Sequence, residues 1–134
     1  MFSFNTIKST RVSFDASRVR ALTHDNHLLV IPAPGPGRAI QVVSAAFRLE
    51  SGDEAYSFTN NLCLRAGRTA QPQFILDVAI VNSSFDEWVG MVPVERGTLG
   101  ENRPITFGPI AGANISFTAD SDVYLDIAYR VVKY

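Results

Sequence analysis

The sequence predicts an all-β protein, an antiparallel β-sandwich or jelly roll of about eight strands, with residues 1–134 as a single domain. Val, Ile and Thr, which favour strands, make up 30 of the 134 residues. Near the C-terminus, apolar side chains alternate with polar ones, as in a half-buried strand. Gly and Pro clusters separate the apolar runs roughly every 8–15 residues, which is typical of short antiparallel strands.

The first part of the chain combines two short strands with one helical turn. Residues 11–14 and 26–31 are the strand candidates. Residues 17–22 can form a single helical turn, with Asp15 or Ser17 as its N-terminal cap.

The middle of the chain predicts longer strands. Residues 40–49 are apolar on both faces until Arg48, which predicts a central strand covered on both sides. Residues 74–81 alternate between two faces and predict another strand. Shorter strand candidates are residues 62–65, 88–94 and 104–107.

The C-terminal part predicts a β-hairpin. Residues 123–131 carry apolar side chains at every second position, and residues 115–119 show a shorter alternation of the same kind. Between them, Asp120-Ser121-Asp122 supplies the short polar side chains that stabilise turns. We therefore expect the two segments to pair as neighbouring strands.

Composition excludes several classes of function. The 12 basic and 13 acidic residues give a formal net charge of −1, and no lysine run offers a site for nucleic acid. The apolar runs are far shorter than the roughly 20 residues that span a bilayer. Cys63 is the single cysteine, so no internal disulfide can form. We expect neither nucleic acid nor a membrane among the partners.

No pattern in the sequence predicts an enzyme, a metal or a cofactor. His24 and His27 could provide two ligands for zinc or nickel, but a polar turn is the favoured interpretation. Cys63 lies in an expected strand, where a buried thiol is more common than a nucleophile. Asp86 and Glu87 are adjacent, whereas glycosidase carboxylates face each other across a cleft. We expect no catalytic, cofactor-binding or metal-binding residues.

Four aromatic residues are candidates for protein contacts. Phe2 and Phe4 precede any expected strand, so residues 1–10 either form an extended N-terminal arm that a neighbour covers or pack on their own domain. Trp88 and Tyr134 are further candidate anchors. Ten of the 12 basic residues are Arg, which protein interfaces favour over Lys, although a coding bias would give the same composition.

Residues 22–67 resemble a segment of small virion structural proteins of tailed bacteriophages. A strand runs into a Pro- and Gly-rich turn, and the apolar strand at 40–49 follows. The end of the chain, from Gly112 through Ile115 to Val131, is similar to the final strands of such proteins. The matching turn and strand motifs are Pro32-Ala33-Pro34-Gly35, Gly37, Gly52, Ala55-Tyr56 and Asn61-Leu62-x-Leu64.

The resemblance implies a non-enzymatic structural protein, most specifically a capsid decoration (cement) protein. Such a protein would bind the major capsid protein on the outer surface of the capsid as a homotrimer, after synthesis in the cytoplasm of the bacterial host. A head-fibre or tail component is an alternative. A carbohydrate-binding module is another, which Trp88, Tyr56 and Phe85 exposed on one face would favour.

Overall fold

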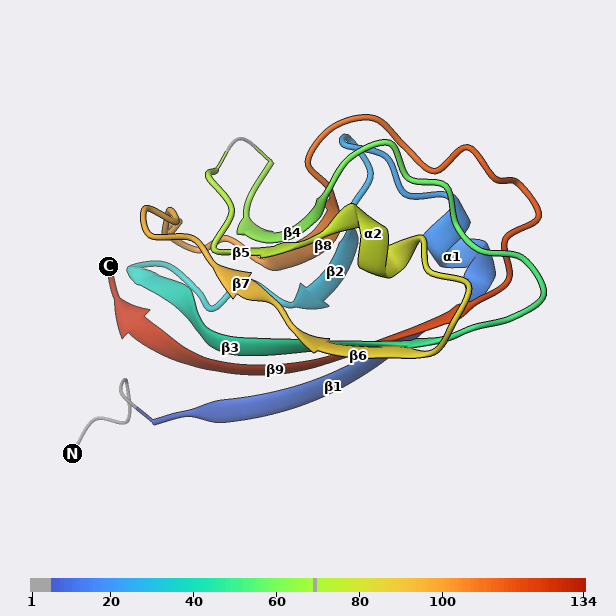
Figure 1. Ribbon diagram of the computed structural model, residues 1–134. Helices are drawn as coiled ribbons and strands as arrows, with labels where there is room; N and C mark the ends of the chain where they lie inside the picture. The colour runs from blue at the N-terminus through green and yellow to red at the C-terminus, as the bar shows by residue number, and fades with distance from the viewer. Residues whose placement is uncertain (1–5, 69) are drawn as a thin grey trace.

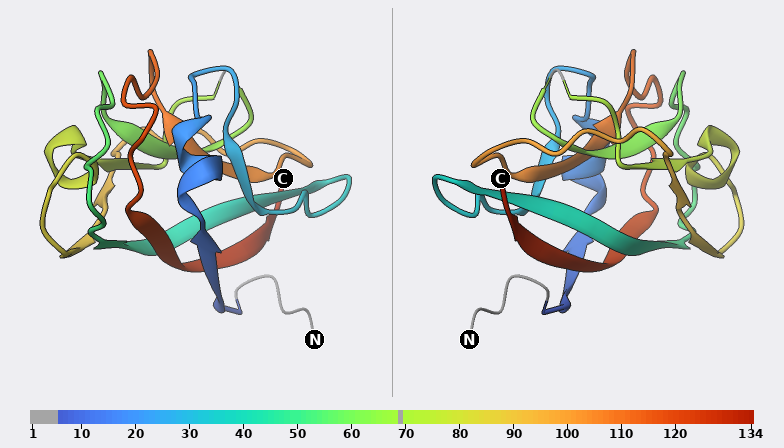
Figure 2. Two further views of the ribbon diagram at one scale, coloured as in Figure 1. Left: turned by 90° about the vertical axis from the view of Figure 1, so that its right-hand side faces the viewer. Right: turned by 90° about the vertical axis from the view of Figure 1, so that its left-hand side faces the viewer.

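Two antiparallel sheets lie face to face in the computed structural model, which describes residues 6–68 and 70–134 (Figure 1). One sheet has the strand order β1-β9-β3-β6 and the other the order β2-β8-β4-β5-β7. Figure 2 shows the four-stranded sheet curving beneath the five-stranded one. The predicted β-sandwich is confirmed, with nine strands in the described residues. They are β1 (Lys8–Phe14), β2 (Leu28–Ile31), β3 (Arg38–Glu50), β4 (Leu62–Ala66), β5 (Phe74–Leu76), β6 (Glu87–Gly90), β7 (Val92–Pro93), β8 (Ile105–Pro109) and β9 (Asp122–Lys133).

The helical turn and most of the short strands agree with the predictions. Helix α1 (Ala16–Arg20) begins after Asp15, whose carboxylate accepts a hydrogen bond from the N–H of Arg18 at 3.1 Å. The run at 88–94 is divided between β6 and β7, which belong to different sheets. Met91 lies at the crossing, where its N–H donates to the carbonyl of Ala45 at 2.8 Å. The short strands predicted at 11–14, 26–31, 62–65 and 104–107 are confirmed as β1, β2, β4 and β8.

Strand β9 confirms the predicted C-terminal strand, but the predicted hairpin is wrong. Both edges of β9 are occupied, since β1 pairs with one and β3 with the other. No edge is left for residues 115–119, which lie in a loop. Asn114 fixes this loop, because its Oδ1 accepts a hydrogen bond from the N–H of Ser57 at 2.8 Å. Phe117 consequently has 84% of its surface exposed.

Strand β3 is central, but only one of its faces is covered, so the prediction of a strand covered on both sides is wrong. A β-bulge lies between Val42 and Ser44. The extra residue at the bulge shifts the inward-pointing positions from even to odd residue numbers. A strict alternation along residues 40–49 therefore assigns apolar residues to both faces, although only one face is buried. Apart from Ala39 at the start of the strand, the buried residues are Ile40 and Val42 before the bulge and Ala45, Phe47 and Leu49 after it.

The strand predicted over residues 74–81 ends at Leu76, and helix α2 (Val78–Val81) follows. Asp77 is the cap of α2, because its carboxylate accepts a hydrogen bond from the N–H of Ala79 at 2.8 Å. The Oδ1 of Asn61 accepts from the N–H of Val78, also at 2.8 Å. These side chains satisfy the first N–H groups of the turn, so the prediction is confirmed for β5 and wrong for residues 78–81.

The core fills the space between the sheets. Phe47 of β3 and Phe107 of β8 are fully buried and stack with ring centroids 6.3 Å apart, so they join the two layers directly. Cys63 lies buried in β4. The connection from β2 to β3 reverses at Gly35 and Gly37, whose φ angles of 108° and 74° favour glycine.

Candidate interaction surface

The outer face of the four-stranded sheet, the one turned away from β2, β4 and β8, carries a row of large side chains. Tyr124 of β9, Arg48 of β3 and Trp88 of β6 are direct cross-strand neighbours, and Ser13 of β1 continues the row. Residues directly opposite each other in paired strands point to the same face. The sheet therefore presents Tyr, Arg and Trp side by side, the types that contribute most to protein interfaces.

Arg48 is fixed in the middle of this row. Its guanidinium lies over the ring of Tyr124, 4.4 Å from the ring centroid, and also forms an ion pair with Glu50. The hydroxyl of Tyr124 donates to Glu50 at 3.4 Å. Trp88 has 71% of its surface exposed. The row is thus electrically balanced by Glu50 and offers an indole to a partner.

A tight turn directly before β6 carries a second exposed aromatic ring. Phe85 is 76% exposed, and its N–H donates to the hydroxyl of Ser83 at 3.1 Å. Next to it, Asp86 accepts hydrogen bonds from the N–H and the hydroxyl of Ser51 at 2.8 and 3.0 Å. These bonds hold the pKa of Asp86 below its usual value. The turn is therefore held in place before any partner arrives.

A shallow hollow of about 360 Å³ lies next to the row on the same face. We call it the outer hollow and define it by two cross-strand rows of mainly small side chains. An exposed ion pair forms part of its lining, with Nε of Arg11 donating to Oδ1 of Asp126 at 2.6 Å. This hydrogen bond lowers the pKa of Asp126. The rows are Ser9–Ala128–Ser44 and Arg11–Asp126–Ala46.

The structure places the predicted contact residues in different parts of the molecule. Phe2 and Phe4 lie outside the described residues. Trp88 lies on the outer face, while Tyr134 is 64% exposed beyond the far end of β9, where its N–H donates to the carbonyl of Gly37 at 2.9 Å. The structure therefore does not bring Trp88 and Tyr134 together. Tyr56 is only 2% exposed and donates its hydroxyl proton to the carbonyl of Ser121, so it does not share a surface with Trp88.

Arg48 and Tyr124 are contact candidates that the sequence analysis missed. Arg48 interrupts an otherwise apolar strand, and Tyr124 falls on the polar positions of the β9 alternation. Both signals place a large side chain on an outer face. Only the register of β9 and β3 makes them neighbours of Trp88, and that register cannot be derived from the alternation alone.

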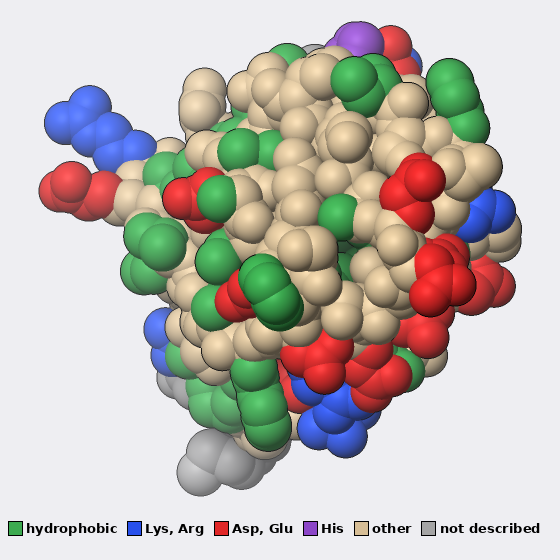
Figure 3. Space-filling view, turned by 45° about the vertical axis from the view of Figure 1, so that its right-hand side comes forward, with side chains coloured by type: hydrophobic (Ala, Val, Ile, Leu, Met, Phe, Trp, Pro, Cys, Tyr) green, Lys and Arg blue, Asp and Glu red, His purple; other side chains and the backbone are tan. Residues whose placement is uncertain are grey.

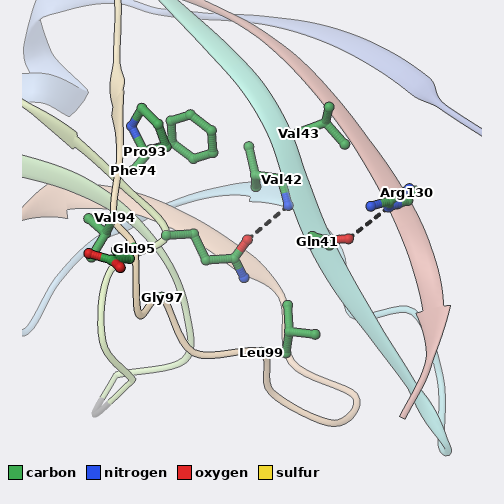
Figure 4. Close-up of a pocket in the computed structure, with 11 residues that line it drawn as sticks. Gln41, Val42, Val43, Phe74, Pro93, Val94, Glu95, Gly97, Leu99 and Arg130 are labelled. Carbon is green, nitrogen blue, oxygen red and sulfur yellow. Dashed lines mark hydrogen bonds between the residues drawn. The ribbon is translucent and has the colours of Figure 1, made fainter.

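A groove of about 490 Å³ lies at the edge of β3, where β6 no longer covers it (Figure 4). Arg130 donates to the Oε1 of Gln41 at 2.7 Å along its wall. Buried Gln73 closes its inner side, and its side-chain amide bonds to the backbone of β3. Glu95 is the single carboxylate among its lining residues, which include neither His nor Cys. These residues support no acid–base pair.

The residues that could carry chemistry lie apart from one another. Burial raises the pKa of the Cys63 thiol to about 11, which disfavours the reactive thiolate. In residues 6–68 and 70–134, no group of three or more His, Cys, Asp or Glu side chains is placed to hold a metal ion. Over the same ranges, no helix is long and apolar enough to cross a membrane.

Acidic side chains gather at one end of the sandwich, on the right of the face in Figure 3. The segments that carry them are joined by hydrogen bonds, as from the N–H of Glu54 to Asp120 at 2.8 Å. The opposite end carries the basic register pair Arg38 and Lys133. The acidic end holds Glu50, Asp53, Glu54, Asp86, Glu87, Asp120 and Asp122, seven of the 13 acidic residues.

His27 gives the fold a pH dependence that can be tested. Its ring packs on Gly108, and its Nε2 lies 2.9 Å from the carbonyl of Pro109. Burial, helped by the charge of Arg65, lowers the pKa of His27 from 6.5 to about 4. The fold favours the neutral ring, whereas the unfolded chain takes up a proton near pH 6.5. Stability should therefore fall as the pH drops from 6.5 towards 4.

The measurement is the thermal unfolding midpoint of the wild type and of His27→Gln between pH 7 and pH 4. We expect the variant to lose less stability over this interval. His24→Gln changes an exposed imidazole and should follow the wild type. Parallel pH profiles for wild type and His27→Gln would contradict the prediction.

Comparisons with known proteins indicate where this fold occurs. No protein-family model matches the chain, and no curated protein matches its sequence. A chain in the cyanophage Pam1 capsid asymmetric unit is 14% identical over 93% of this chain and 84% of its own, with a TM-score of 0.58. A chain in the capsid of Ralstonia phage GP4 is 12% identical over 92% of this chain and 83% of its own, with a TM-score of 0.50. At these identities the likeness is one of fold, and this fold is found in phage capsid assemblies.

Proposed function

We propose that this chain is a phage virion structural protein, a non-enzymatic capsid decoration protein. In this role it binds the major capsid protein on the outer surface of the head as a homotrimer and stabilises the shell. The observation that supports the proposal is the fold likeness to two phage capsid chains, which extends over 93% and 92% of the sequence. The turn and strand motifs of residues 22–67 point to the same class.

The mechanism in this proposal is mechanical. A rigid sandwich that contacts several capsid subunits links them, so the shell opens only when many modest interfaces break together. The outer sheet face provides the contact in this role, because Tyr124, Arg48 and Trp88 form a preorganised row in which Trp88 is largely exposed. Association of copies also covers sheet edges that would otherwise attract unrelated strands.

Two measurements test the proposal. Light scattering after size exclusion should give a species near three times 14.7 kDa. The purified protein should then sediment with capsid shells of the encoding phage and raise the temperature at which they open. A monomer at every concentration that does not sediment with shells would contradict it. Sedimentation with tails and not with heads would favour a fibre or tail component.

Trp88→Ala should weaken shell binding roughly 30-fold, or about 2 kcal/mol, because an exposed indole at an interface centre contributes much of the binding energy. The free protein should keep its stability within about 0.5 kcal/mol, since the ring is largely exposed. Phe117→Ala is the matched control, because it removes an exposed ring outside the sheet face. Equal shell binding by wild type and Trp88→Ala would show that this row is not the contact.

A carbohydrate-binding module is the second candidate, because Trp88 and Phe85 are both exposed near the same strand. Burial of Tyr56 removes one of its three expected stacking residues. Trp88 is the single tryptophan, so its fluorescence reports on this surface alone. A shift of the Trp88 emission on adding glycans would favour the carbohydrate-binding module. An emission that does not change with glycans would favour the capsid role.

A further inference from the structure

We propose that the outer hollow receives residues 1–5 of a neighbouring copy, with the rings of Phe2 and Phe4 packed against its small side chains. This inference rests on the proposed function, because it requires several copies to assemble. It identifies the partner of this part of the sheet face as a second copy of the chain.

The outer hollow is built to let another chain approach closely. On its floor, the side chains of Ala46, Ala128 and Ser44 extend no more than one heavy atom beyond Cβ, so a ring above these three residues can approach the sheet closely. The charges of Arg11 and Asp126 in its lining neutralise each other, so an apolar occupant leaves no unpaired charge. The Arg11 guanidinium can also lie against an aromatic ring there.

The spacing of the two phenylalanines matches the spacing of the outer hollow. In an extended segment, residues two apart point to the same side and lie about 7 Å apart. Along β1 the two rows of the hollow are also two residues apart, at Ser9 and Arg11. An extended segment lying parallel to the strands therefore places one ring over each row. Phe2 and Phe4 are two residues apart in the sequence.

The position of the first described residues favours a neighbouring copy over the same domain. Residues 1–5 precede β1, an edge strand, and reach at most about 17 Å when extended. To reach its own outer hollow, the chain would have to reverse at Thr6 and Ile7, two β-branched residues that favour an extended backbone over a tight turn. Thr6 and Ile7 are exposed and β-branched, which favours an extended chain that continues past its own sheet.

A mixed-disulfide experiment tests the exchange. Phe4→Cys and Ala46→Cys are made in separate chains, one with a mass tag, and the two are mixed under mild oxidation. We expect a disulfide between tagged and untagged chains. Ser13→Cys replaces Ala46→Cys as the control, because position 13 lies on the same face outside the hollow, and it should give at least about tenfold less product. Cys63 stays in place, since it is buried.

Closure of the disulfide within one chain that carries both Phe4→Cys and Ala46→Cys, in place of the mixed product, would overturn the exchange. The double variant Phe2→Ser/Phe4→Ser adds an independent readout, with self-association expected to weaken at least about tenfold. If the wild type is an oligomer, the double variant has the same oligomeric mass and no mixed disulfide forms, the exchange is wrong. The proposal of a decoration trimer is unaffected by that result. A wild-type monomer contradicts both.

Discussion

Phe47→Ala is expected to lower the free energy of unfolding by about 3–5 kcal/mol. Phe47 is fully buried in β3 and stacks on Phe107 of the facing sheet. Removal of the ring leaves a cavity between two sheets that their own hydrogen bonds hold in shape, so the space cannot close fully. Because small domains have only about 5–15 kcal/mol of stability in total, a large share of it depends on this pair.

Urea unfolding followed by circular dichroism measures this loss. Phe117→Ala is the matched control, because it removes the same ring from a side chain that is 84% exposed. The control should change the unfolding free energy by no more than about 0.5 kcal/mol. Similar losses in the two variants would show that the ring contact between the sheets does not carry the stability we assign to it.

Gln73→Leu should destabilise the fold by about 3 kcal/mol, although leucine is more apolar and of similar size. The buried amide of Gln73 accepts from the N–H of Val42 at 2.8 Å and donates to the carbonyl of Ile40 at 3.1 Å. It thus takes the place of a neighbouring strand where β6 has left the edge of β3. Leucine would leave both backbone groups buried without a partner, at about 1–3 kcal/mol each.

Gln71→Leu is the control for this substitution, because it makes the same change at an exposed position two residues earlier. Its expected effect is below about 0.5 kcal/mol. Amide hydrogen exchange adds a local readout, since the N–H of Val42 should lose protection in Gln73→Leu. Unchanged protection of Val42 would show that the side-chain amide is not what closes this edge.

The local alternation of apolar and polar residues was sufficient to predict most strands. It did not predict which strands pair with one another. The period of two in β9 is visible because Val123, Leu125 and Ile127 are all buried by one sheet. Nothing local reveals that β1, more than 100 residues away, occupies the edge that the 115–119 segment would need. The bulge in β3 caused the wrong prediction of a strand covered on both sides for a related reason. One extra residue exchanges the two faces, so the exposed face cannot be recognised from a regular alternation.

The candidate surface was predictable only one residue at a time. Trp88 stood out as the single tryptophan, but its partners come from strands that are distant in the sequence. Gln73 gave no signal at all, because a glutamine beside a proline is typical of a loop. Its importance depends on where β6 leaves β3, which is a property of the assembled sheets.

The separation of acidic and basic side chains affects how the molecule moves before it touches anything. Because the net charge is only −1, a distant charged capsid exerts little net electrostatic attraction on the molecule. The acidic end and the end that carries Arg38 and Lys133 give it a dipole, and an electric field exerts a torque on a dipole. Within a Debye length of a charged capsid surface, about 8 Å in physiological salt, this torque orients the end of opposite charge towards the surface. Added salt would then slow its productive arrival while leaving its departure nearly unchanged.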